Sequence, residues 1–199
     1  IQVWDKEDLA EMLDWEAVDA FRARALNPEH PVQRGTAQNP DIFFQAREAC
    51  NTYYEAVPDV VEAYMNEVNK RIGSNYKLFN YYGPRDAKRV IIAMGSVCET
   101  IEETVDHMNA AGDKVGLIKV RLYRPFSAKH LIAALPAGVE CISVLDRTKE
   151  PGSVGEPLYL DVVAALKGSK FESVPVYTGR YGLGSKDTTP GQVVAVYRN

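Results

Sequence analysis

From residue 89 to residue 146, three short apolar runs alternate with helical patterns. The runs cover residues 90–94, 115–120 and 140–145, and a polar loop follows each of them. Between the first two runs, apolar residues recur at helical spacing at Val97, Ile101, Val105 and Met108. Continuous apolar runs of this length are typical of strands that are buried on both faces. The pattern therefore predicts an open α/β sheet with parallel strands.

Two further runs extend the predicted sheet. Residues 77–82 precede the alternating region, residues 173–177 follow it, and a nearly all-apolar helix starts at Pro157. We expect an α/β fold of three layers, with a mainly parallel sheet of about five strands between flanking helices, in residues 76–199.

Residues 1–75 carry helical patterns without strand signals. Asp5 can cap a helix that runs to about Ala25, and Asn39 with Pro40 can start another. We expect the second helix to break or kink at Pro58, because proline lacks the backbone donor that a helix interior needs. The prediction is a helical extension, residues 1–75, that packs on the sheet domain.

The turn after the first strand resembles a phosphate site, but its neighbours argue against that interpretation. Ser96 and Glu99 have the spacing of a capping box, in which each side chain bonds the backbone N–H of the other residue. These bonds would use the donors that a phosphate needs, and the acids that follow would repel an anion. We predict a capped structural helix.

Two later loops combine charge with glycine, at residues 146–156 and 179–187. Their charged residues could hold a phosphate or a carboxylate, or they could contact another domain while acids in the loops pair with the cations. We favour the domain contact, because acids nearly match bases and no G-x-G-x-x-G or P-loop pattern is present. The candidate contact residues are Arg147, Lys149, Glu150, Glu156, Arg180 and Lys186.

Composition excludes several classes of protein. The 199 residues are 46% hydrophobic with a net charge of −4, and no basic stripe for nucleic acid or apolar span for a membrane is visible. Three widely spaced cysteines, Cys50, Cys98 and Cys141, offer neither a disulfide framework nor a cluster-binding set. We expect a cytoplasmic protein, and because the chain begins without methionine we interpret it as a piece of a longer one.

No catalytic residue emerges from the residue types and their spacing. There is no G-x-S-x-G elbow, and no histidine is suggestively placed beside Ser96, Ser127 or Ser153. The three histidines show no ligand spacing, so no chemistry is assigned to them. We predict no catalytic, cofactor-binding or metal-binding residue in this chain.

Four long sequence blocks resemble one enzyme family. They are RGTAQNPDIFFQARE (34–48), KVRLYRPFSAKHL (119–131), LDRTKEPGSVGEPLYLDV (145–162) and GRYGLGSKDTTPGQ (179–192). In this order they resemble the pyruvate:ferredoxin (flavodoxin) oxidoreductases, also called pyruvate synthases. The chain would correspond to the second domain of such an enzyme, which resembles the transketolase C-terminal domain.

The resemblance implies an activity for a longer polypeptide, not for this chain alone. The family oxidatively decarboxylates pyruvate with coenzyme A to acetyl-CoA and CO2 and reduces ferredoxin or flavodoxin. It uses thiamine diphosphate, Mg²⁺ and [4Fe-4S] clusters, none of which we expect to bind here, since the G-D-G motif and the cysteine sets are lacking. The implied partners are other domains of the same polypeptide, in a homodimer.

Two alternatives stay open at this point. The charged loops could make the chain a binding module for coenzyme A or another anionic ligand. The chain could also be the equivalent domain of another thiamine-dependent oxoacid dehydrogenase.

Overall fold

The computed structural model describes residues 3–33, 35 and 37–199. The chain divides into two compact units, Ile1–Tyr53 and Tyr54–Asn199. Arg34 and Thr36, within the sequence block of residues 34–48, lie outside the described residues. The predicted domain boundary at residue 75 stays a prediction.

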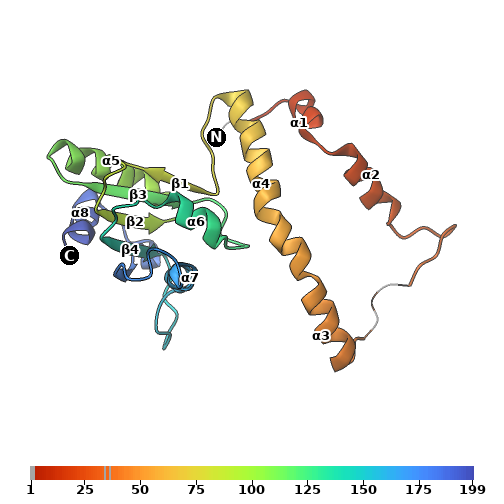
Figure 1. Ribbon diagram of the computed structural model, residues 1–199. Helices are drawn as coiled ribbons and strands as arrows, with labels where there is room; N and C mark the ends of the chain where they lie inside the picture. Colours follow the sequence, from red (N-terminus) through yellow and green to blue (C-terminus); the bar gives the residue numbers. More distant parts are fainter. Residues whose placement is uncertain (1–2, 34, 36) are drawn as a thin grey trace. The chain divides into compact units, whose positions relative to one another are not determined.

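The described residues of the first unit form α1 (Lys6–Met12), α2 (Trp15–Ala23) and α3 (Pro40–Ala49), and its last residues begin α4 (Asn51–Ile72) (Figure 1). The prediction of one helix from Asp5 to Ala25 is wrong, because the chain leaves helical geometry at Leu13 and Asp14. The Asp14 carboxylate accepts a hydrogen bond of 2.9 Å from the Ala17 N–H and so caps a new helix. A short carboxylate favours such a cap over a helix interior.

The long helix α4 continues through Pro58, so the predicted break at this proline is wrong, while a kink there stays a prediction. The interruption lies instead at Cys50, between α3 and α4. A proline inside a helix removes one backbone hydrogen bond, a cost that burial of the ring offsets in part, and Pro58 is buried.

The second unit is built around a five-stranded sheet in the order β1-β3-β2-β4-β5. Only β1 is antiparallel to its neighbour, and the other pairs are parallel. The strands are β1 (Phe79–Tyr82), β2 (Arg89–Ala93), β3 (Val115–Val120), β4 (Cys141–Asp146) and β5 (Val176–Arg180). The prediction of a mainly parallel sheet of about five strands is confirmed, although the last strand begins three residues later than expected.

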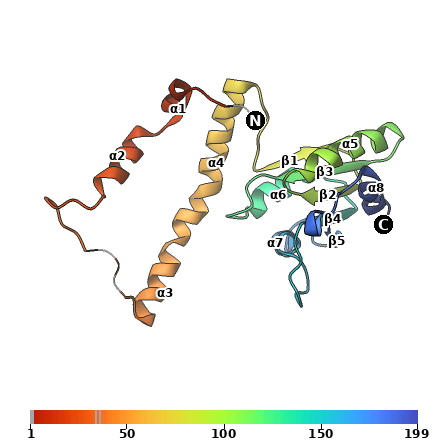
Figure 2. The same cartoon turned by 180° about the vertical axis from the view of Figure 1, so that it is seen from behind.

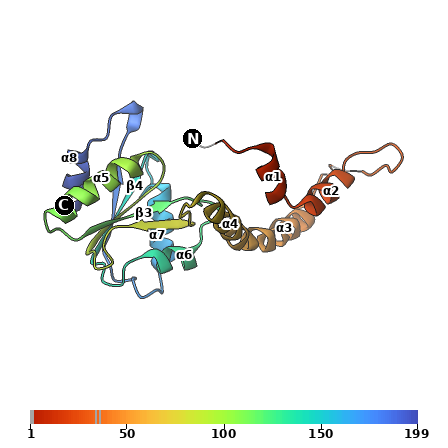
Figure 3. The ribbon, with the colours of Figure 1, turned by 90° about the horizontal axis from the view of Figure 1, so that it is seen from above.

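Helices cover both faces of this sheet, as Figures 2 and 3 show. One apolar core lies between the sheet and α5 (Val97–Ala110) with α8 (Pro190–Arg198). The other lies on the opposite face, under α6 (Ala128–Ala134) and α7 (Pro157–Leu166). Val61 and Met65 of α4 pack against this second core. The predicted three-layer α/β architecture is confirmed.

The predicted capping box at the start of α5 is wrong. Ser96 already has helical backbone angles, φ −64° and ψ −22°, and its hydroxyl makes no cap hydrogen bond. A capping side chain acts from an extended residue, and here Gly95, with φ +81°, makes the turn instead. The Ser96 hydroxyl therefore does not occupy the first-turn donors, and only the acids of α5 still argue against an anion.

A tyrosine in α8, Tyr197, connects this helix to the sheet by a hydrogen bond. Tyr197 is 2% exposed, and its hydroxyl donates a 2.8 Å hydrogen bond to the carbonyl of Gly116 in β3. Burial raises the pKa of this hydroxyl, so it stays a donor. Residue 116 has to be small, because a Cβ there would collide with the Tyr81 ring. The pair joins α8 to the middle of the sheet.

We predict that Tyr197→Phe destabilises the chain by about 1–3 kcal/mol, because the buried Gly116 carbonyl loses its donor. Urea unfolding followed by circular dichroism measures the change. Tyr177→Phe is the matched control, since Tyr177 is 52% exposed. Equal stability of the two variants would contradict the anchoring role of Tyr197.

Candidate functional site

The two charged loops lie next to each other at the carboxyl ends of neighbouring parallel strands. Asp146 at the end of β4 stands opposite Arg180 at the end of β5 in the strand register. Loops at this edge of a parallel sheet form the usual binding surface of α/β folds. Tertiary structure thus brings the predicted residues of both loops to one edge.

An ion pair between a fully buried carboxylate and a partly exposed arginine links the loops. Glu156 has no exposed surface, and one of its carboxylate oxygens accepts a hydrogen bond from the Arg180 guanidinium. The other oxygen accepts a 2.8 Å bond from the backbone N–H of Glu150. Both oxygens of Glu156 are therefore bonded, as a buried carboxylate requires.

These bonds change the acidity of Glu156. Burial by itself raises the pKa of the carboxyl, but the Glu150 N–H and Arg180, with the nearby charge of Lys149, together hold it below the ordinary value. Glu156 is therefore ionised at neutral pH and fixes Arg180 in place.

Asp146 binds the first turn of α7 rather than the cations of the loops. It was expected to pair with the cations of the loops, but its two oxygens accept from the backbone N–H groups of Leu158 and Tyr159, at 2.9 and 3.2 Å. These groups are free donors in the first turn of α7. Burial raises the pKa of Asp146, while the two N–H bonds lower it, and the net shift is upward.

The remaining candidates are exposed at the surface. Arg147 donates from Nε to the Gly182 carbonyl at 3.2 Å and so joins the two loops a second time. Lys149 and the side chain of Glu150 are exposed. Lys186 is exposed too, and its ammonium has no ion pair or hydrogen bond within the described part of the chain.

The loop after β5 has a fixed, compact backbone. It contains the short 3-10 turn η1 (Leu183–Ser185), and Gly182, Gly184 and Ser185 all have left-handed angles, with φ near 60°. A side chain at residue 182 would come within 3.0 Å of the Arg147 Nε. Gly182 is therefore required both for its angle and for the close approach of Arg147.

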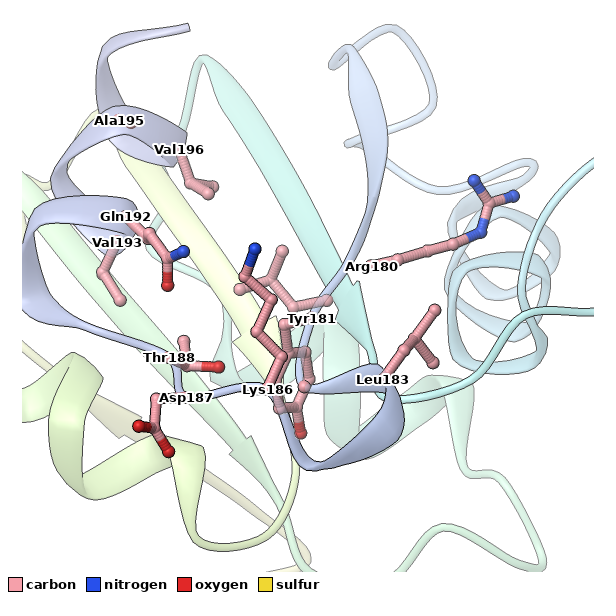
Figure 4. A pocket seen from close by; sticks show the side chains of 12 residues that line it. Arg180, Tyr181, Leu183, Lys186, Asp187, Thr188, Gln192, Val193, Ala195 and Val196 are labelled. Carbon is pink, nitrogen blue, oxygen red and sulfur yellow. The ribbon is translucent and has the colours of Figure 1, made fainter.

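Beside this loop lies a groove of about 480 Å³, which the sequence did not reveal. Its apolar lining comes from β4, from the loop and from α8, through Leu145, Leu183, Val193 and Val196. Figure 4 shows Lys186 extending across it, while Arg180 points away. The helical start at Thr189, Pro190 and Gln192 was a visible signal for α8, but nothing in the sequence placed α8 against this loop.

A serine and a histidine lie together at the start of α6, contrary to expectation. Ser127 Oγ is 2.6 Å from His130 Nδ1, and His130 Nε2 is 3.6 Å from Glu62 in α4. The spacing of three residues was the signal that the sequence offered. Ser127 does not line the neighbouring pocket. The contact therefore joins α4 to α6, and it carries no catalytic assignment.

Burial makes Cys98 and Cys141 poor candidates for nucleophiles. Burial raises the pKa of Cys98 to about 11, and it also raises the pKa of Cys141. Within the described ranges, no three His, Cys, Asp or Glu residues lie close enough to hold a metal ion. No helix of the described chain has the length and apolar character needed to cross a membrane.

The fold is shared with a solved enzyme structure. A 2-oxoglutarate:ferredoxin oxidoreductase from Magnetococcus marinus, solved with 2-oxoglutarate, coenzyme A and succinyl-CoA bound, aligns with a TM-score of 0.52 and 18% sequence identity. The alignment covers 82% of this chain and 24% of that one. The similarity defines the α/β class of the domain.

The sequence comparisons are more specific. Residues 87–193 match the family described as pyruvate:ferredoxin oxidoreductase core domain II. Residues 1–66 match the family described as pyruvate flavodoxin/ferredoxin oxidoreductase, thiamine diphosphate-binding. The chain belongs to the pyruvate:ferredoxin oxidoreductase family, and the family resemblance seen in the sequence is confirmed.

The relatives are much longer than this chain. The pyruvate-flavodoxin oxidoreductase of Enterobacter agglomerans is 57% identical and the pyruvate:ferredoxin oxidoreductase of Moorella thermoacetica 58% identical over 199 residues. Both alignments cover the whole of this chain but only 17% of the relative. The chain therefore corresponds to one region of a multidomain enzyme.

We predict that Glu156→Gln lowers stability at neutral pH and weakens its dependence on pH in acid. Because folding lowers the pKa of Glu156, its contribution is complete above the ordinary value of 4.5 and is lost as the pH falls from there through the folded pKa. Urea midpoints between neutral pH and about pH 3 measure this. Glu140→Gln, at an exposed carboxylate, is the control. An unchanged acid limb in Glu156→Gln would contradict the role of the Glu156–Arg180 pair.

Proposed function

We propose that this chain is a structural, inter-domain module of a pyruvate:ferredoxin or pyruvate:flavodoxin oxidoreductase. The complete enzyme oxidatively decarboxylates pyruvate with coenzyme A, forms acetyl-CoA and CO2, and reduces ferredoxin or flavodoxin. The observation that carries the proposal is the match over the whole chain to relatives of which it covers only 17%. The family match also favours this enzyme over another thiamine-dependent dehydrogenase.

The cofactors of the proposed enzyme are thiamine diphosphate, Mg²⁺ and [4Fe-4S] clusters. The described residues of this chain do not fit the metal groups, because the three cysteines are far apart in sequence and no metal-ligating cluster is formed. We infer that other regions of the polypeptide supply the sites for Mg²⁺ and the [4Fe-4S] clusters. No chemical step is assigned to this chain.

The physical state of the candidate residues supports a contact role. Glu156 and Arg180 neutralise each other, and Asp146 is committed to α7, so the strongest charges at the sheet edge are used to hold the loops. Arg147, Lys149, Glu150 and Lys186 remain exposed for other domains of the same polypeptide. We propose that the intact polypeptide is a cytoplasmic homodimer that passes electrons to ferredoxin or flavodoxin.

We predict that the 199-residue chain alone does not reduce a viologen dye when it is given pyruvate, coenzyme A, thiamine diphosphate and Mg²⁺. The intact polypeptide, purified without oxygen, should reduce it. The rate of dye reduction is the measurement. Activity of the chain alone would refute the module, and failure of the active intact polypeptide to use pyruvate would refute the proposed reaction.

Coenzyme A binding by the chain itself is the competing function, and Lys186, which has no partner in the described residues, is the feature that favours it. Calorimetry with coenzyme A and with thiamine diphosphate tests this function. We expect no heat of binding from either compound. A heat that Arg180→Ala or Lys186→Met abolishes would show a ligand-binding module instead.

A further inference from the structure

We infer that the groove between α8 and the loop after β5 receives a segment of another domain of the same polypeptide, and that this segment places an apolar side chain next to a carboxylate. The inference rests on the proposed function and narrows it from two loops to one surface. It assigns Lys186, rather than Arg180, as the residue that recognises the partner.

The two cations at the groove, Arg180 and Lys186, differ in whether their charge is already paired. Arg180 also lines the groove, but its guanidinium is bonded to Glu156 and points away from the Lys186 side chain, so its charge is already balanced (Figure 4). Lys186 extends across the groove and has no partner in the described residues. Asp187 also lines the groove, but its carboxylate points away from the Lys186 ammonium (Figure 4). An uncompensated ammonium beside an apolar surface favours an incoming carboxylate.

The apolar lining of the groove explains why the incoming segment should carry an apolar side chain. Leu145 forms part of the lining, and it lies over Gly179, where a Cβ would come within 2.6 Å of it. Val193 and Val196 of α8 form one side of the groove. Leu145 and Val193 are 4% and 1% exposed and form its floor, whereas Leu183 in the loop is 43% exposed. Apolar surface bordered by charged side chains is typical of a protein contact, with an apolar centre and a polar rim.

Both walls of the groove are already ordered, which lowers the entropy that docking costs. The loop wall is held by the Arg147 bond to the Gly182 carbonyl and by the Tyr181 hydroxyl, which donates to the Met94 carbonyl at 3.3 Å. The helix wall begins with a capping box, in which Gln192 accepts from the Thr189 N–H at 2.9 Å.

The length of the relatives identifies the source of the occupant. Relatives that are 57–58% identical over all of this chain extend far beyond it, since it covers 17% of each. Neighbouring domains of one polypeptide are present at high effective concentration, so a single apolar anchor and one ion pair suffice to hold them.

The test is a zero-length cross-link in the intact polypeptide. A carbodiimide joins an amine to a carboxylate only when the two are in contact, and peptide mass spectrometry then identifies the partner residue. We expect Lys186 to be joined to an Asp or Glu of another domain. We also expect its amine to react with acetic anhydride about tenfold more slowly than in the 199-residue chain.

Two variants separate the charge of residue 186 from its ability to form the cross-link. Lys186→Arg keeps the charge but cannot form the cross-link, so it should lose the cross-link and keep resistance to limited proteolysis between domains. Lys186→Glu should lose both. If Lys186→Glu is as resistant as the unsubstituted polypeptide, the inference is wrong.

Other occupants give other results, and each overturns the inference. Slow labelling of Lys186 in the 199-residue chain that depends on protein concentration indicates a second copy. Slow labelling that appears only when coenzyme A is added indicates a small anion. Equal labelling of the intact polypeptide and the chain indicates an open surface. Since labelling does not depend on turnover, an active intact enzyme with a reactive Lys186 would refute this inference and leave the proposed function standing.

Discussion

The first turn of α7 is buried beside the end of β4, and its free N–H groups need acceptors there. Asp146 supplies both acceptors from the last residue of β4. This fixes the start of α7 and therefore the position of Glu156, which immediately precedes it. Glu156 then binds Arg180 on the neighbouring strand. The path of both charged loops depends on these contacts of Asp146 and Glu156. Burying either carboxylate without hydrogen-bond donors would cost too much free energy of folding.

The same contacts explain why the sheet edge looks like a binding site and yet has little free charge. Carboxyl ends of parallel strands usually leave polar groups for a ligand. Here Asp146 accepts from the first turn of α7, Glu156 accepts from Arg180, and Arg147 donates to a backbone carbonyl. Lys149, Glu150 and Lys186 stay exposed, and Lys186 lies beside an apolar groove, which is a surface suited to a neighbouring domain.

The fold was largely predictable because its strands are buried on both faces. Such strands read as continuous apolar runs, and alternation with helical patterns leaves few possible topologies. Local caps were less predictable. Ser96 had the capping-box spacing but adopts helical angles, whereas Asp14 caps a helix where continuity was expected. A cap depends on the backbone angles of one residue, and the pattern of residue types does not specify these angles.

The sequence by itself determined the α/β class, the family and the two loops that carry the candidate residues. These features depend on local apolar periodicity and on long blocks of similar residues. Only the tertiary structure decided which charges are available: it paired Glu156 with Arg180, gave Asp146 to α7, and left Lys186 across a groove formed with α8. The reason is physical, since the partners are brought together by the pairing of β4 with β5 and by the packing of α8, and residue types along the chain do not encode that proximity.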